Sequence, residues 1–135
     1  MATKVLDSWA LMAFFRDEPA AEMMEHLLEQ ATAGHHKLLL CVINWGELYY
    51  SILRAEGQAV TEQKVRDIAA LPIEIVPVES DLILVRQAAQ IKAAHKMSYA
   101  DSFAAALAKI RKAELVTGDP EFKQVEDEVR IGWLK

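Results

Sequence analysis

Cysteine is nearly absent from this chain: Cys41 is the single cysteine among 135 residues, and it lies in an apolar run. One cysteine excludes a disulfide framework and a metal site built on several thiolates. Long apolar runs are also missing, since no stretch approaches the roughly 20 residues that a membrane span needs. The N-terminus lacks a basic segment followed by an apolar signal region. We therefore expect a cytoplasmic protein that does not span a membrane.

Positive charge is scarce as well. Lysine and arginine total 15 against 20 aspartates and glutamates, which gives a formal net charge of −5. This balance argues against a protein that binds nucleic acid by bulk electrostatics alone. It does not exclude an enzyme that acts on nucleic acid, because bound divalent cations reverse the local charge. The hydrophobic fraction of 53% predicts a packed globule, and the length suits a single domain spanning residues 1–135.

Apolar runs with strand character alternate with stretches of helical periodicity along the whole chain. The run at 38–42 is continuously apolar, as in a strand that is buried on both faces of a parallel sheet. The alternation predicts an α/β fold with four to five parallel strands between two layers of helices. The expected strands are 1–6, 38–42, 73–76, 113–117 and, at one edge, 128–131. The expected helices start near Ser8, Asp17, Asn44, Thr61, Ser80, Ser98 and Asp119.

Four acids occur at corresponding points of this pattern: Asp7, Glu47, Asp101 and Asp119. Each has a structural explanation when it is taken alone. Asp7 and Asp119 can cap the helices that follow them, and Pro120 suits the first helical position after Asp119. Glu47 and Asp101 each stand three residues after a possible cap, as the acids of capping boxes do.

Taken together, the four acids favour a metal site. Residues just after parallel strands lie at the carboxyl edge of the sheet, where ligands bind, and Asp7 and Asp119 converge there if their strands are neighbours. Two carboxylates about 5 Å apart repel by roughly 3 kcal/mol at an effective dielectric constant near 20, so gathering several of them is unfavourable without a cation. Oxygen ligands alone favour Mg²⁺ or Mn²⁺ over Zn²⁺. Ser8 and Thr117 add hydroxyl groups at the same edge.

With these residues identified, the chain resembles the PIN-domain nucleases, and within them the toxins of VapBC toxin–antitoxin pairs. The matching segments are 5–8, 44–50, 98–106 and 115–122, which span the chain in family order. The resemblance implies a sheet with strand order 3-2-1-4-5 and a Mg²⁺- or Mn²⁺-dependent endoribonuclease. Its acidic site would match Asp7, Glu47, Asp101 and Asp119, with Ser8 and Thr117 in supporting positions. The chain departs from the family pattern at two positions. Asn44 stands where members often have Ser or Thr, and Glu121 stands where many members have Asp.

The hypothesis is metal-assisted hydrolysis of RNA. Asp7, Asp101 and Asp119 would be ligands, directly or through water, and Glu47 would act on a water or a second ion. Lys92, Lys96 and Lys123 are the candidate RNA contacts, and Arg16 is a further one.

Partners are predicted from surplus apolar surface on the helices within residues 11–28 and 45–52, which would suit an amphipathic partner helix. The resemblance implies that this partner is a VapB-type antitoxin and that the toxin forms a homodimer.

Three alternatives belong to other classes. A phosphatase of the haloacid dehalogenase type uses Asp-x-Asp after its first strand, but Trp9 stands at the second acidic position. A receiver-like signalling domain needs an adjacent acid pair and a later strand-end lysine, and neither is evident. A catalytically silent PIN-like scaffold or nucleic-acid-binding domain is opposed by the presence of all four acids.

Overall fold

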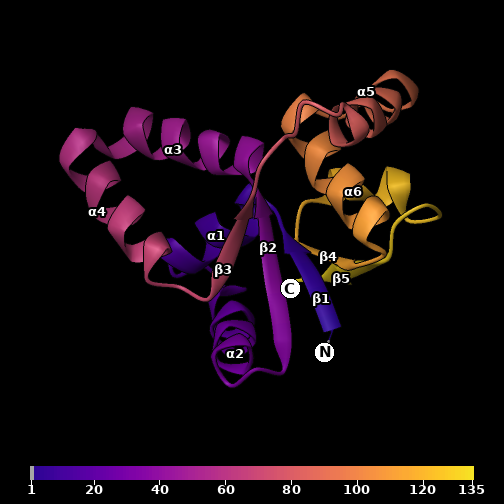
Figure 1. The fold of residues 1–135 in the computed structure, drawn as a ribbon. Helices are drawn as coiled ribbons and strands as arrows, with labels where there is room; N and C mark the ends of the chain where they lie inside the picture. The colour runs from indigo at the N-terminus through magenta and orange to yellow at the C-terminus, as the bar shows by residue number, and fades with distance from the viewer. Residues whose placement is uncertain (1) are drawn as a thin grey trace.

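The computed structural model describes residues 2–135 and has at its centre a five-stranded parallel sheet of order β3-β2-β1-β4-β5 (Figure 1). This is the order expected from the sequence, and the α/β fold class is confirmed. The strands are β1 (Ala2–Leu6), β2 (His36–Cys41), β3 (Ile73–Val76), β4 (Glu114–Thr117) and β5 (Ile131–Trp133).

Six α-helices and one 3₁₀-helix connect the strands within the described residues. They are α1 (Ser8–Phe15), α2 (Ala21–Thr32), α3 (Val42–Glu56), α4 (Gln58–Ala69), α5 (Ile83–Ala94), α6 (Tyr99–Arg111) and the 3₁₀-helix η1 (Pro120–Val125). None of the helices between residues 2 and 135 combines the length and the apolar character that crossing a membrane requires.

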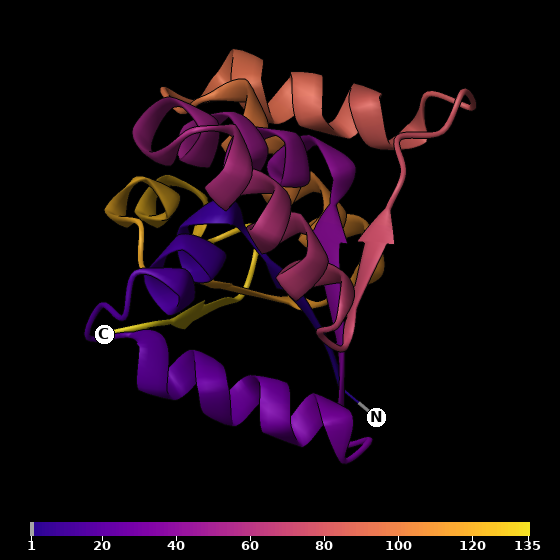
Figure 2. The same ribbon diagram turned by 90° about the vertical axis from the view of Figure 1, so that its left-hand side faces the viewer.

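The helices form two layers because successive side chains of a strand point to opposite faces of the sheet. Leu39 and Leu115 pack against α5, α6 and η1, whereas Leu38, Leu40 and Val116 pack against α1 to α4. Figure 2 views the molecule from the side of α1 to α4, with the sheet behind them. Both faces of β2 are therefore buried, as its continuous apolar run predicts.

The strand register brings the carboxyl ends of β1 and β4 together. Leu6 pairs with Leu40 on one side and with Val116 on the other. Asp7 and Thr117, which come next in each chain segment, consequently lie at the same edge of the sheet. The expected neighbourhood of the first and fourth strands is confirmed.

The helix starts predicted at Asp17 and Thr61 are wrong. Asp17 does not cap α2: it has a left-handed backbone (φ 51°), and the helix begins four residues later at Ala21. Thr61 lies inside α4, where its hydroxyl donates to the carbonyl of Gly57 at 2.7 Å. Thr61 thus uses its hydroxyl inside the helix, whereas Asp17 lies in the turn between α1 and α2.

The edge strand is also displaced from its expected position at 128–131 to Ile131–Trp133. The amide groups of Glu128 and Val129 both donate to the carbonyl of Val125 at 2.9 Å. These bonds continue the turn that follows η1, so the backbone groups needed for strand pairing are already occupied there.

Leu39→Ala tests the position of the core. Leu39 is fully buried in the central part of the sheet, so truncation should lower the free energy of unfolding by about 2–5 kcal/mol through lost burial and a residual cavity. Urea unfolding followed by circular dichroism measures this loss. Val60→Ala on the exposed face of α4 is the control and should change stability by less than about 0.5 kcal/mol. Equal losses of unfolding free energy in the two variants would contradict the placement of Leu39 in the core.

Candidate active site

A cavity of about 410 Å³ opens at the carboxyl edge of the sheet, within the range of roughly 300–1,000 Å³ usual for ligand sites. A slightly larger cavity of about 460 Å³ lies between α2 and β5, but its lining is mainly apolar. The chemistry of the lining, and not size, therefore marks the first as the candidate site. It is lined by Ser8, Trp9, Met12, Arg16, Glu18, Glu47, Ser51, Asp101 and Asp119.

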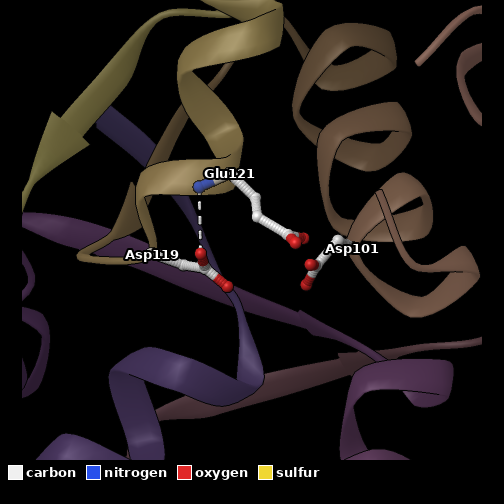
Figure 3. Close-up of side chains that lie close together, drawn as sticks. All are labelled: Asp101, Asp119 and Glu121. Carbon is white, nitrogen blue, oxygen red and sulfur yellow. Dashed lines mark hydrogen bonds between the residues drawn. The ribbon is translucent and has the colours of Figure 1, made fainter. Parts of the chain in front are cut away.

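Three carboxylates meet most closely in this region. Oxygen atoms of Asp101, Asp119 and Glu121, one from each residue, lie within 4.8 Å of one another. Figure 3 shows the three side chains converging from α6 and from the start of η1. Asp119 caps η1, as predicted, with its Oδ1 accepting the Glu121 amide N–H at 3.0 Å. Glu121 thus joins the cluster, although the sequence marked it only as a departure from the family pattern.

Asp7 is held apart from this trio. It is fully buried and does not line the cavity. Its Oδ1 accepts the Ala10 amide N–H at 2.9 Å, which caps α1, and its Oδ2 accepts the Thr117 hydroxyl at 2.6 Å. Burial raises the pKa of Asp7 to about 7, with smaller contributions from the charges of Asp101 and Asp119 and partial compensation by the two hydrogen bonds.

Thr117 connects Asp7 to the trio. Its buried hydroxyl donates to Asp7 and accepts the Asp119 amide N–H at 3.0 Å. The Thr117 side chain therefore positions the carboxylate of Asp7 directly and the backbone of Asp119. Thr117 therefore lies at the edge of the sheet where the sequence placed it, and its supporting role in the site stays a prediction.

Glu47 reaches the cavity from α3, where the Ser8 hydroxyl donates to its carboxylate. The predicted capping box of Asn44 and Glu47 is wrong, because α3 already begins at Val42. Asn44 is buried inside the helix, and its amide donates to the carbonyl of Ala100 at 3.0 Å. Asn44 therefore joins α3 to the start of α6, and the Glu47 carboxylate is free of any cap role.

Asp101 lies in the first turn of α6, which is capped as predicted by Ser98: the Ser98 hydroxyl accepts the Asp101 amide N–H at 3.1 Å. Burial, together with the charges of Glu47, Asp119 and Glu121, raises the pKa of the Asp101 carboxyl to about 7, although the hydrogen bond with Ser98 lowers it in part. The site thus makes protonation of a carboxyl group favourable at neutral pH when no cation balances the charge.

The donor set fits a hard divalent cation. At 4.8 Å two charged carboxylates repel by about 3–4 kcal/mol at an effective dielectric constant near 20. The three clustered side chains offer oxygen ligands only, which suit Mg²⁺ or Mn²⁺. Asp101, Asp119 and Glu121 are the residues that could hold such an ion, while Glu47 lines the same cavity and Asp7 is joined to the trio through Thr117.

Among residues 2–135, one basic residue lines the cavity, and it is not one of the three lysines. Lys92, Lys96 and Lys123 are exposed on α5, the loop before α6 and η1, outside the cavity lining. Arg16, at the C-terminal end of α1, is part of the lining. Arg16 is the further candidate named from the sequence, and its place in the lining depends on how α1 packs. RNA contact by the three lysines stays a prediction.

Comparison with known proteins gives a family and a set of similar folds. A family model for the PIN domain matches residues 4–128. VapBC2 from Rickettsia felis, bound to a DNA fragment from its promoter, is 15% identical with a TM-score of 0.76, covering 98% of this chain and 99% of that one. DNA-bound VapBC from Salmonella typhimurium is 16% identical with a TM-score of 0.74, covering 98% of both chains.

A further similar structure is VapC20 from Mycobacterium tuberculosis, described as a sarcin–ricin loop cleaving toxin. It is 15% identical with a TM-score of 0.69, covering 90% of this chain and 94% of that one. Identities this low show a shared fold. No curated protein matches the sequence closely enough to count as a relative.

Thr117→Val should destabilise the protein by about 1–3 kcal/mol, because Asp7 loses a donor and the Asp119 amide loses an acceptor in a buried setting. Urea unfolding at neutral pH measures the loss. Thr117→Ser keeps the hydroxyl and removes only a methyl group, so its loss should stay near about 1 kcal/mol. A serine variant as unstable as the valine variant would show that the methyl group matters and not the hydrogen bonds.

Stability without metal should fall as pH rises. In the folded protein Asp7 and Asp101 keep their protons up to a pKa of about 7, whereas the ordinary value is 3.8. The folded state therefore loses relative stability between about pH 4 and pH 7. In EDTA, the wild-type Tm should drop over this range more than that of Asp101→Asn. Asp127→Asn, at an exposed position, should follow the wild type. If the Tm of all three proteins changed with pH in the same way, the raised pKa of Asp101 would be contradicted.

Proposed function

Because the chain belongs to the PIN-domain family, we propose that it is a Mg²⁺- or Mn²⁺-dependent endoribonuclease that hydrolyses phosphodiester bonds of RNA. The observation that carries the proposal is the convergence of Asp101, Asp119 and Glu121 within 4.8 Å at the edge of a cavity. Such a cluster is electrostatically unfavourable unless protons or cations balance it. A cation bound here would balance the charge of the carboxylates and would also suit a site that cleaves RNA, which is a polyanion.

Each acid has a distinct place in the proposed mechanism. Asp101 and Asp119 face the cavity and would hold the cation with Glu121. Asp7, which was also predicted to be a ligand, would contact the cation through a water molecule, because its oxygens already accept two hydrogen bonds. When bound, the cation lowers the pKa of a coordinated water and neutralises charge on the phosphate. Glu47, oriented by Ser8, would accept the proton from the attacking water.

The same contacts disfavour a phosphatase in which Asp7 is a nucleophile. A nucleophilic carboxylate must have an oxygen that can reach the substrate phosphorus. Asp7 has no exposed surface, and both of its oxygens accept hydrogen bonds. A metal-bound role for the acids therefore suits the geometry better than covalent catalysis.

We further propose that residues 1–135 act as one nuclease domain and serve as the toxin of a toxin–antitoxin pair in the cytoplasm, with a VapB-type antitoxin as partner. The similar folds of VapBC complexes support this assignment. Exposed apolar side chains on several helices are available for contact with a partner: Met23 and Tyr50 on α2 and α3, and Leu82, Ile83 and Tyr99 near the starts of α5 and α6. A homodimer would bury some of these side chains.

Asp101→Asn tests the proposed chemistry. The wild type should cleave single-stranded RNA in Mg²⁺ or Mn²⁺ and not in EDTA, because the carboxylates alone cannot activate water. Replacing Asp101 should lower the cleavage rate by at least about a hundredfold, beyond the 10–100-fold typical of residues that only support a ligand. Gel analysis of labelled RNA measures the rates.

Asp127→Asn is the matched control, since Asp127 is exposed and lies outside the cavity lining; it should cleave at the wild-type rate. Saturating Mg²⁺ should also raise the Tm of the wild type more than that of Asp101→Asn, by mass action on the folded state. Cleavage that persists in EDTA would refute the metal mechanism. Absence of both cleavage and a Mg²⁺-dependent rise in Tm would instead support a silent scaffold of the same fold.

A further inference from the structure

Helix α1 presents two faces with different chemistry. Ala10 and Leu11 are fully buried in the core between α1 and the sheet. Trp9, Met12 and Arg16 follow the spacing i, i+3 and i+7, which places them on one side of the helix, and all three line the acidic cavity. The part of the lining that α1 supplies is therefore aromatic and apolar with a cation at its end, and the carboxylates of Glu18, Glu47, Asp101 and Asp119 line the same cavity.

The indole of Trp9 is held against the active-site backbone. A Cβ placed on Gly118 would overlap the six-membered ring of Trp9. Gly118 stands between Thr117 and Asp119, and its backbone is not in the left-handed region, so close approach of the ring is what requires glycine there. Trp9 stays half-buried, so the ring is fixed in place while part of its surface remains open to the cavity.

This part of the lining has the chemistry of a nucleotide site. A single-stranded RNA presents flat bases between phosphates, and aromatic side chains bind such bases by stacking with little dependence on sequence. Among the described residues that line the cavity, Arg16 alone carries positive charge, which suits contact with a phosphate. A phosphate placed at the carboxylate cluster leaves its adjoining base near the Trp9 and Met12 side of the cavity.

We propose that Trp9 stacks on a nucleobase next to the scissile phosphate, and that Arg16 binds a neighbouring phosphate of the same strand. This rests on the proposed function, since it takes RNA as the substrate. The competing explanation is that Trp9 only fills space, because it also packs against the core formed with α1 to α4. A space-filling role predicts a loss of stability on substitution but no dependence of binding on the bases of the ligand.

Two probes separate these explanations. The first is a short labelled single-stranded RNA of mixed sequence. The second is an oligomer of the same length built from tetrahydrofuran spacers, which carries the phosphates and no bases. Binding is measured by fluorescence anisotropy in Mg²⁺ with proteins that also carry Asp101→Asn, so that the RNA stays intact. The Tm of each variant is recorded to confirm folding.

Trp9→Leu should raise the Kd for the RNA about tenfold, as expected for one lost base-stacking contact, and leave the Kd for the spacer oligomer within about twofold of its original value. Trp9→Phe should keep most of the RNA affinity. Trp133→Leu, which removes a tryptophan on β5 outside the acidic cavity, should change neither value. Arg16→Gln should weaken both ligands, because both carry phosphates.

In the background with Asp101 intact, Trp9→Leu should raise KM about tenfold and change kcat by less than about threefold, because the lost contact binds substrate and transition state alike. If Trp9→Leu weakened the binding of both probes equally, or of neither, the stacking proposal would be overturned. Cleavage of RNA by the wild type would still support the nuclease assignment in that case. A wild type that neither binds nor cleaves RNA in Mg²⁺ would overturn both.

Discussion

The hydrogen bond from the buried hydroxyl of Thr117 to Asp7 joins the ends of two neighbouring strands, and the rest of the site depends on it. Asp7 in turn caps α1, and the same hydroxyl accepts the amide of Asp119. The direction of α1 and the backbone position of Asp119 are therefore set from one buried point. Parallel pairing of β1 with β4 makes this possible, because it places the residues that follow each strand at the same edge of the sheet.

Around this point the fold gathers acids that repel one another. Local geometry compensates for part of the repulsion, since Asp7 and Asp119 each accept backbone amide bonds as helix caps. Burial nonetheless raises the pKa of both Asp7 and Asp101 to about 7. Near neutral pH these two carboxyl groups of the metal-free site are consequently divided between the protonated and the ionised form. Binding of a divalent cation would shift that balance toward the ionised form, which couples stability, pH and activity.

The helix that Asp7 caps contributes to both the core and the cavity. Its buried face contacts the sheet, and its other face brings Trp9, Met12 and Arg16 toward the carboxylates. An acidic protein with a formal net charge of −5 cannot attract RNA by its overall field. Short-range contacts beside a bound cation are a physically consistent solution, because they act where the negative charge of the site has been neutralised.

The amino-acid sequence by itself determined the order of strands and helices, the burial of β2 on both faces, and the caps at Ser98 and Asp119, because these depend on residues close together in the chain. The segments that resemble PIN domains also identified the sheet order and the acids Glu47, Asp101 and Asp119 that the structure brings to one cavity. Only the tertiary structure decided the remaining features.

Asn44 lies inside α3 and contacts Ala100, 56 residues away, and no local pattern encodes that contact. Glu121 joins Asp101 across 20 positions of the chain, and Arg16, in place of the three lysines, enters the cavity through the packing of α1. Local periodicity and capping residues specify where an element begins and which face it buries. The contacts between distant elements depend on how those faces pack, and they decide which side chains share the site.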